Sequence, residues 1–240
     1  MEYAVPTPAV NTLTVAGRNE RFPVNRIFCV GRNYAAHARE MGKDPDREPP
    51  FFFMKPANAT VDATQEVTVP YPVKTANYHH EIELIVAIAK GGADIPMASA
   101  LEHVYGYAVG LDMTRRDLQL DARDKGRPWE FGKSFVHSAV IGPLHRAQDI
   151  GHPAKGAISV TVNAQPRQSS DISKLIWSVS ECIAYLSEYE ALEPGDLIMT
   201  GTPEGVGCAR KPPVFLREGD SIAVEIDGIG ELANRVEKDR

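Results

Sequence analysis

The chain has 240 residues, of which 43% are hydrophobic and 24% charged, a composition typical of a globular domain. Its 26 basic and 32 acidic side chains give a net charge of −6, which argues against binding to nucleic acid or to a membrane surface. No apolar run is long enough to span a membrane, and residues 1–17 lack the regions of a signal peptide, so we expect a cytoplasmic protein.

The first quarter of the chain predicts short strands joined by proline-rich segments. Residues 1–25 carry three prolines and predict an extended arm with one small hairpin. Asn33 precedes an Ala-rich run that ends at Gly42, so Asn33 is predicted to cap a short helix of about two turns. Strands are predicted over 26–31 and 51–55, with a charged loop over 43–50 between the helix and the second strand.

The rest of the chain predicts more strands than helices. The Ser178–Glu181 spacing matches a capping box, which predicts a helix to about Tyr189. Other helices are predicted over 96–103 and 114–125, and strands over 80–89, 104–111, 157–163, 165–169, 197–200, 221–226 and 229–236. Since the strands do not alternate with long helices, we expect an α+β domain with a mainly antiparallel or mixed sheet.

Three carboxylates lie in strands that otherwise read as buried. Glu81 and Glu83 begin the apolar run 80–89, and Asp112 follows the run 104–111. Side chains alternate along a strand, so the two glutamates share a face, and burying ionised carboxylates requires a counter-charge. A divalent cation would supply it, and three oxygen ligands suit Mg²⁺ or Mn²⁺. The alternative is an exposed strand start and a helix cap.

The other polar residues admit two interpretations each. His37 and Glu40 share one face of the short helix, where they form either a general base or a solvated pair. His79 and His80 are either soft metal ligands or part of a turn.

The sequence pattern alone does not decide the roles of the remaining candidates. Arg116 and Gln119 belong to a charged helix, and Lys133 to a strand-like stretch; all three are surface residues by default. The glycine-rich loop 200–207 lacks a phosphate-loop pattern, so it is either a plain turn or a pocket wall of backbone amides and hydroxyls.

An ordered set of motifs resembles the fumarylacetoacetate hydrolase family. The motifs run from about residue 26 to 232 and are GRNYAAHAREMG (31–42), FFFMKP (51–56), HHEIEL (79–84), GYAVGLDMTRRDLQ (106–119), GKSF (132–135), EPGDLIMTGTPEGVG (193–207) and EGDSIAVEIDGIGEL (218–232). The resemblance implies a β-roll of mixed sheets with a few flanking helices, usually a homodimer. It also implies one catalytic domain over 26–240, with a lid at about 33–48.

The resemblance also implies roles for individual residues. It implies Glu81, Glu83 and Asp112 as ligands of one Mg²⁺ or Mn²⁺ ion. It implies His37, Glu40 and Lys133 as catalytic residues, and a substrate pocket lined by Arg116, Gln119, Gly201 and Thr202.

The implied reaction is hydrolysis of the carbon–carbon bond of an acylpyruvate. The chain is most similar to the branch that converts fumarylpyruvate to fumarate and pyruvate in gentisate breakdown. Because that substrate is a dianion, we expect Arg115 or Arg32 to bind its distal carboxylate. The alternatives are a general acylpyruvase, an oxaloacetate decarboxylase, an isomerase or hydratase of an unsaturated 2-oxo acid, and a non-catalytic keto-acid binding module.

Overall fold

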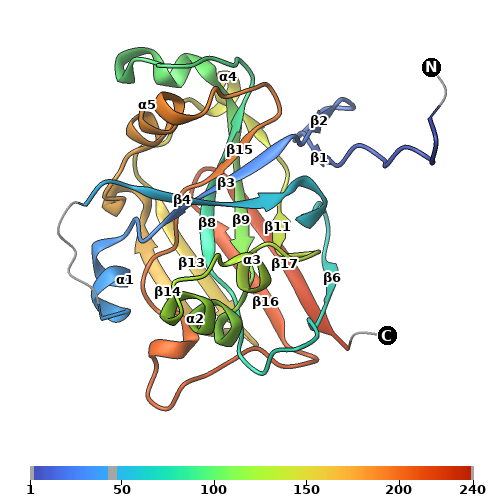
Figure 1. The fold of residues 1–240 in the computed structure, drawn as a ribbon, viewed down its shortest axis with the longest axis vertical. Helices are drawn as coiled ribbons and strands as arrows, with labels where there is room; N and C mark the ends of the chain where they lie inside the picture. Colours follow the sequence, from blue (N-terminus) through green and yellow to red (C-terminus); the bar gives the residue numbers. More distant parts are fainter. Residues whose placement is uncertain (1–2, 43–47, 239–240) are drawn as a thin grey trace.

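Two stacked β-sheets dominate the computed structural model, which describes residues 3–42 and 48–238 (Figure 1). The larger sheet is mixed, because β3 pairs in parallel with β15, and β5 with β11, while its other pairs are antiparallel. Its order is β4 (Phe51–Pro56), β3 (Arg26–Gly31), β15 (Leu197–Met199), β8 (Ile82–Ile88), β9 (Val104–Asp112), β11 (Ala139–Ile141) and β5 (Thr60–Asp62), with β12 (His145–Arg146) beside β9.

The second sheet is built mainly from hairpins with alternating burial. Its order is β14 (Gln165–Asp171), β13 (Ala157–Val162), β16 (Ser221–Ile226), β17 (Gly230–Glu237) and β6 (Val67–Pro70). The β13–β14 turn has φ of 50° at Asn163 and 60° at Ala164, the left-handed values that a tight hairpin turn requires. Together the sheets confirm the predicted α+β, mainly β, mixed-sheet class.

Short helices and small strand pairs surround the sheets. The strand pairs are β1 (Thr12–Thr14) with β2 (Arg21–Pro23), and β7 (Tyr78–His79) with β10 (Thr114–Arg115). The helices are α1 (Ala35–Glu40), α2 (Arg116–Asp124), α3 (Glu130–Lys133), α4 (Ala147–Ile150) and α5 (Val179–Tyr189), with 3-10 turns η1 (Ala57–Ala59), η2 (Met97–His103), η3 (Ile172–Lys174) and η4 (Gly207–Ala209). None of the described helices is long and apolar enough to cross a membrane.

Apolar side chains pack on both faces of the larger sheet. One cluster fills the space between the two sheets, where Leu84 and Val109 meet Val160 and Val224. The other lies on the opposite face, where Leu13 and the rest of the β1–β2 hairpin cover the sheet. Because both faces are covered, β8 is buried along its whole length, and a carboxylate in it lies in the protein interior.

Several local predictions can be compared with the structure. The capping box at Ser178 and Glu181 is present and begins α5. Gly42 has a φ of 71° directly after the last turn of α1, as predicted, whereas residues 43–47 of the predicted loop and lid lie outside the described residues.

The predicted N-cap role of Asn33 is wrong. Tyr34 holds that position, and Asn33 is fully buried. The Asn33 amide donates to the backbone oxygens of Trp177 and Thr200, so it joins three chain segments instead of capping a helix.

Two of the differences from the predicted elements affect the surroundings of Asp112. The charged helix begins at Arg116 and not at Thr114, because Thr114 and Arg115 pair with β7. Lys133 is the last residue of the short helix α3, so the prediction that it belongs to a strand-like stretch is wrong.

Candidate active site

Three carboxylates meet where β8 begins and β9 ends. The strands are antiparallel with Ile82 opposite Leu111, and the Asp112 amide donates to the Glu81 carbonyl oxygen over 2.8 Å. Antiparallel pairing therefore places Asp112 beside Glu81, and strand alternation places Glu83 on the same face. The candidate ligand atoms of Glu81, Glu83 and Asp112 all lie within 4.8 Å of one another, and all three residues are buried.

Three cationic side chains surround these carboxylates. Lys133 Nζ donates to Glu81 Oε2 and to Asp112 Oδ2, each over 2.6 Å. Lys55 Nζ lies 2.8 Å from Asp112 Oδ1, and the Arg116 guanidinium pairs with Glu81. These cations partly compensate the cost of burying the carboxylates, and their own burial lowers the pKa of both lysines.

Glu83 has the weakest compensation. Its Oε2 accepts the Gly201 amide proton over 2.8 Å, yet burial and the neighbouring Asp112 charge raise its pKa to about 8. At Asp112 burial acts in the same direction, but Lys133 and Lys55 outweigh it and hold the pKa of that carboxyl below its usual value. Three adjacent carboxylates with one poorly compensated member fit a hard divalent cation with oxygen ligands.

A histidine that lines the same pocket as the carboxylates is paired with a glutamate. His37 Nδ1 lies 3.3 Å from Glu40 Oε2, and the Gly205 amide donates to Glu40 Oε1 over 2.9 Å. The glycine-rich loop thus fixes Glu40, and Glu40 orients the imidazole. Burial lowers the pKa of His37, so the ring is neutral near pH 7 and can accept a proton.

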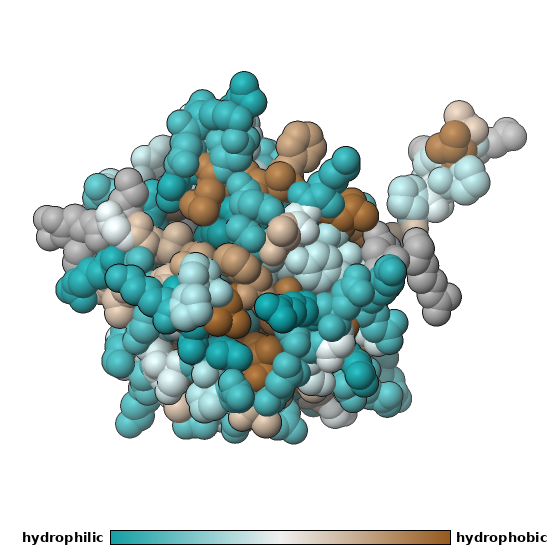
Figure 2. Space-filling model, turned by 90° about the horizontal axis from the view of Figure 1, so that it is seen from below, coloured by the Kyte–Doolittle hydropathy of each residue, from teal (hydrophilic) through white to brown (hydrophobic). Residues whose placement is uncertain are grey.

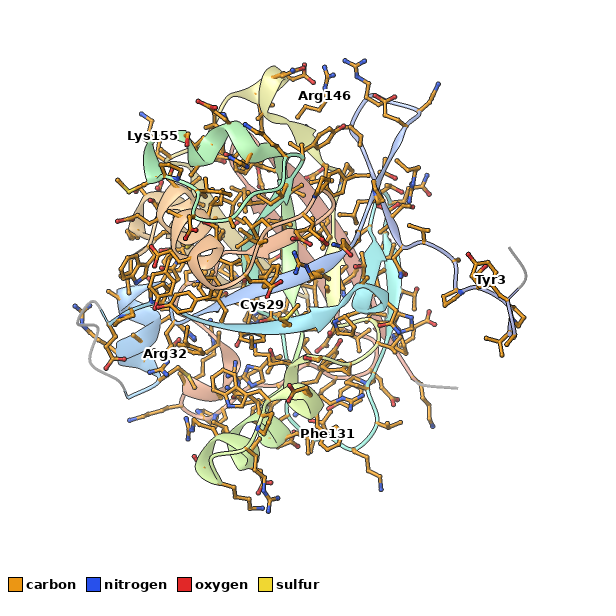
Figure 3. All side chains as sticks on the ribbon, turned by 45° about the horizontal axis from the view of Figure 1, so that its top comes forward. Tyr3, Cys29, Arg32, Phe131, Arg146 and Lys155 are labelled. Carbon is orange, nitrogen blue, oxygen red and sulfur yellow. The ribbon has the colours of Figure 1, made fainter. Side chains whose placement is uncertain are left out.

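One pocket contains most of the predicted residues. It is lined by Arg32, His37, Glu81, Glu83, Asp112, Arg116, Gln119, Lys133 and Thr202, with Met41 and the aromatic residues Phe51, Phe53 and Trp129. Arg116 Nη1 donates to Gln119 Oε1 over 3.0 Å, and Thr202 Oγ1 accepts a hydrogen bond from Gln168. Figure 3 shows Arg32 beside α1, at the edge of the molecule.

Two predicted binding residues have other positions. Arg115 does not line this pocket: its guanidinium lies 4.2 Å from the ring centroid of Phe135 and lines another cavity with Val136, which removes it as a candidate for the distal carboxylate. Gly201 uses its amide for Glu83, and its φ of 98° brings the loop close to Asn33, so it supports a carboxylate instead of facing the pocket.

The sequence interpretation missed several residues of this site, among them Lys55, Arg123 and Trp129. Lys55 is buried beside Asp112, while Arg123 and Trp129 line the pocket. Arg123 lies four residues after Gln119 and seven after Arg116, so helical spacing carried a usable signal. Nothing in the run FFFMKP indicates that its lysine, Lys55, is part of the site, because its counter-charge, Asp112, comes from a strand distant in the sequence.

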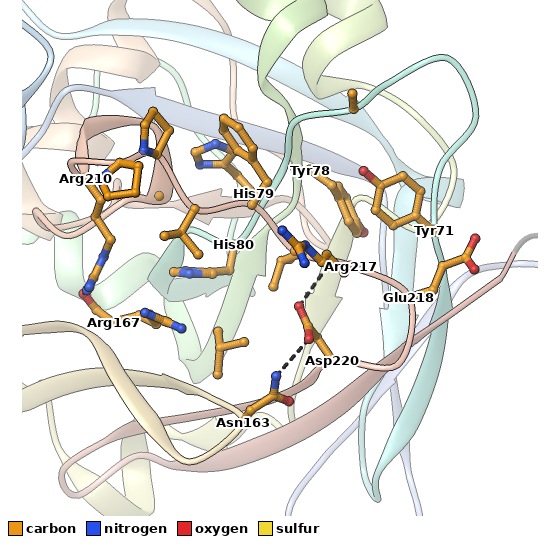
Figure 4. Close-up of a pocket in the computed structure, with 18 residues that line it drawn as sticks. Tyr71, Tyr78, His79, His80, Asn163, Arg167, Arg210, Arg217, Glu218 and Asp220 are labelled. Carbon is orange, nitrogen blue, oxygen red and sulfur yellow. Dashed lines mark hydrogen bonds between the residues drawn. The ribbon is translucent and has the colours of Figure 1, made fainter.

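The two adjacent histidines do not join the carboxylates. They line a separate cavity of about 830 Å³ with Arg167, Arg210 and Arg217 (Figure 4). His80 Nδ1 lies 3.0 Å from Gln168 Oε1, and the His79 ring packs against Phe215. Among the described residues, the clustered candidate ligands are Glu81, Glu83 and Asp112, without histidine.

Replacing Lys55 with methionine should destabilise the metal-free protein. The variant leaves Asp112 buried without one of its two lysine partners, a change that costs about 3–5 kcal/mol of unfolding free energy. We expect a smaller loss in saturating Mn²⁺, because a bound cation would replace the missing charge. Urea unfolding with chelator and with Mn²⁺ measures both values, and the exposed Lys90→Met is the control. Equal losses in the two conditions would contradict this account.

Comparison with known proteins agrees with this geometry. The family model described as fumarylacetoacetate (FAA) hydrolase C-terminal matches residues 26–237. A fumarylpyruvate hydrolase of Ralstonia sp is 47% identical over 195 residues, which cover 80% of this chain and 96% of that protein. The human mitochondrial oxaloacetate tautomerase FAHD1 is 41% identical over 212 residues, covering 88% of this chain and 91% of that protein.

Solved structures show the same fold. The crystal structure of fumarylpyruvate hydrolase from Pseudomonas aeruginosa in complex with Mn²⁺ and pyruvate has a TM-score of 0.94 at 55% identity and covers 99% of this chain and 100% of that chain. The 5-carboxymethyl-2-hydroxymuconate delta-isomerase of Mycobacterium smegmatis has a TM-score of 0.76 at 34% identity, covering 90% of this chain and 80% of that chain. This chain therefore belongs to the fumarylacetoacetate hydrolase family.

Proposed function

We propose that the protein is a metal-dependent hydrolase that cleaves acylpyruvates, with 3-fumarylpyruvate and water giving fumarate and pyruvate. The observation that carries this proposal is the shared pocket: His37, which is paired with Glu40, lines the same pocket as Glu81, Glu83 and Asp112. The similarity to two fumarylpyruvate hydrolases, 47% and 55% identical, supports the substrate.

Glu81, Glu83 and Asp112 would hold one divalent cation, Mn²⁺ or Mg²⁺. When bound, the cation supplies Lewis acidity to the carboxylate and 2-oxo oxygens of the substrate. The fumarylpyruvate hydrolase from Pseudomonas aeruginosa was crystallised with Mn²⁺ and pyruvate, which supports both the metal and pyruvate as a product. Lys133 pairs with Glu81 and Asp112, and Lys55 pairs with Asp112, so the two lysines hold these carboxylates in place.

His37 serves as the general base. It takes a proton from water, and the hydroxide oxygen adds to the distal carbonyl carbon of the substrate. The bond between that carbon and the neighbouring CH₂ then breaks, its electron pair forms pyruvate enolate, and the proton held by His37 returns to the enolate carbon. Glu40 accepts a hydrogen bond from the Nδ1–H of the imidazole and stabilises the imidazolium between the two transfers.

Hydrogen-bond donors in the pocket stabilise the negative oxygen of the tetrahedral intermediate. The three protons of Lys133 are engaged by Glu81, Asp112 and Thr114, so we assign it to positioning the carboxylates. The Gln119 amide and the Thr202 hydroxyl remain as donors, since both line the pocket and accept the bonds described above through oxygen.

The rate should stay high below the usual pKa of histidine. Burial lowers the pKa of His37 from 6.5, the charges of Arg116 and Lys133 act in the same direction, and Glu40 opposes them. Since the neutral ring is the base, we expect kcat/KM to fall only as the pH drops through a value below 6.5. In Glu40→Gln this acid limb should move to lower pH. A pH profile with the limb above 6.5 would contradict the base assignment.

A second candidate reaction is proton transfer on a 2-oxo acid without cleavage. It is supported by the 41% identity to a protein named oxaloacetate tautomerase, and the same histidine pair would serve it. Fumarylpyruvate, acetylpyruvate and oxaloacetate should each be incubated with Mn²⁺ and with chelator, and the products resolved by mass. Hydrolysis gives equimolar pyruvate and carboxylic acid, decarboxylation gives carbon dioxide, and tautomerisation, isomerisation or hydration leaves the carbon count unchanged.

We also propose a cytoplasmic homodimer that acts in the breakdown of aromatic compounds. Large apolar side chains are exposed at Met54, Phe131, Val73 and Val136, with 46% to 82% of each residue accessible. Figure 2 shows hydrophobic residues gathered in the middle of the face that carries α2. Light scattering on the purified protein tests the dimer: twice the 26.3 kDa chain mass is expected, and the single chain mass would contradict it.

A further inference from the structure

One face of α2 reaches from the carboxylates to the pocket mouth. Arg116, Gln119 and Arg123 lie three and four residues apart, so they share that face. Arg116 and Gln119 are buried, and Arg116 pairs with Glu81. Arg123 also lines the pocket, but 38% of its side chain is exposed. The helix therefore presents one guanidinium in the depth of the pocket and a second at its mouth.

The positive charge at the mouth is poorly compensated. Arg32 follows β3 on the wall formed by β3 and β4, where its guanidinium lies 4.7 Å from the Phe51 ring centroid. Across residues 3–42 and 48–238, Arg32 has no ion pair, and Arg123 pairs only with Asp124, whose side chain is 64% exposed. Arg32 also adopts a φ of 55°. Positive values of φ are uncommon for residues other than glycine, and the residues that adopt them cluster at functional sites.

The distance between Arg116 and Arg123 along the helix suits a substrate with two carboxylates. Seven residues of helix separate Arg116 from Arg123, or about 10.5 Å along the axis. A seven-carbon chain places its terminal carboxyl carbons about 7–8 Å apart at ordinary bond lengths. With its keto-acid end beside Glu81 and Asp112, such a substrate would place the second carboxylate near the mouth.

We propose that Arg123, assisted by Arg32, binds the distal carboxylate of a dianionic acylpyruvate and so determines the preference for fumarylpyruvate over acetylpyruvate. This inference rests on the proposed function, because it assumes that the keto-acid end binds beside the carboxylates. Arg123 is here a specificity-determining residue, and it takes no part in the proton transfers. The short acyl group of acetylpyruvate carries no charge for it to contact.

Kinetics of Arg123→Ala test the proposal. We expect kcat/KM for fumarylpyruvate to fall about 10–150-fold, the range for a lost charged hydrogen bond, mainly through KM. Acetylpyruvate turnover should change less than about threefold, since that substrate lacks the contacted group. Arg127→Ala is the matched control, because Arg127 is exposed just beyond α2 and does not line the pocket. A similar loss for both substrates, or none for fumarylpyruvate, would overturn the proposal.

A binding measurement decides the question even if neither acylpyruvate is hydrolysed. 2-Oxoheptanedioate and 2-oxoheptanoate have the same length, differ in the distal carboxylate and lack the second carbonyl needed for cleavage. Calorimetry with Mn²⁺-loaded protein should show tighter binding of the dianion by wild type, and near-equal binding by Arg123→Ala. Equal binding by wild type, or a dianion preference that survives the substitution, would refute the role of Arg123. Absence of hydrolysis alone would refute only the proposed function.

Discussion

Replacing His37 with alanine should abolish most hydrolysis while leaving the metal site intact. General-base catalysis typically contributes about 10²–10⁴-fold, so we expect kcat for fumarylpyruvate to fall by that factor. In the described structure His37 pairs with Glu40 and makes no hydrogen bond to Glu81, Glu83 or Asp112, so Mn²⁺ affinity should change little. Steady-state kinetics and calorimetric titration with Mn²⁺ and then oxalate, a mimic of pyruvate enolate, measure the two effects separately.

The matched control for this variant is His137→Asn. His137 is exposed, lies outside the pocket and has a φ of 63°, which asparagine tolerates. We expect wild-type hydrolysis from it. Unchanged hydrolysis by His37→Ala would show that another group is the base. Loss of Mn²⁺ binding would show instead that the histidine supports the metal site.

The second large effect is expected at Asp112. Asp112→Asn keeps the shape of the side chain but removes the charge, and we expect it to lower both Mn²⁺ affinity and activity. Because a Lewis-acid cation contributes several kcal/mol to stabilising charge in the transition state, the activity should fall by about 10³-fold or more. Asparagine is preferred to alanine because it fills the same space and still offers one oxygen, which can accept from Lys55 or from Lys133.

Chelation should reproduce this loss reversibly in the wild-type protein. We expect activity to disappear with chelator and to return on adding Mn²⁺ or Mg²⁺. The thermal midpoint should rise on re-addition, because a ligand that binds the native state stabilises it. Asp112→Asn should show no such rise. Full turnover by a metal-stripped sample would contradict the assignment of Glu81, Glu83 and Asp112 as cation ligands.

The cluster of three carboxylates could be predicted in part from the sequence, because local strand geometry relates two of its members. Glu81 and Glu83 share a face by strand alternation alone, and an apolar strand around them implies burial. Asp112 joins them through the register of β8 with β9, which a sequence does not specify but which the family motifs implied. The spacing of His37 and Glu40 was local too, because a single turn of helix brings the two side chains together.

The missed features depend on contacts between distant segments. Asparagine is a common helix cap, but Asn33 is buried, and its side-chain amide donates to the backbone oxygens of Trp177 and Thr200 instead. Lys55 is fully buried because Asp112, 57 positions later in the chain, pairs with it. Arg115 is predicted near the substrate because it lies just past Asp112, yet it belongs to β10 and not to α2 and lines another cavity. Local periodicity carries no signal for such pairings.

Cleavage of fumarylpyruvate in isotopically labelled water (H₂¹⁸O) tests the central claim most directly. The Mn²⁺-loaded wild type should give equimolar fumarate and pyruvate, with the label in the fumarate carboxylate formed at the broken bond. The same sample with chelator, and the His37→Ala variant, should give neither product at a comparable rate. A product of unchanged carbon count, release of carbon dioxide, or unlabelled fumarate would contradict hydrolysis by the His37–Glu40 pair above Glu81, Glu83 and Asp112.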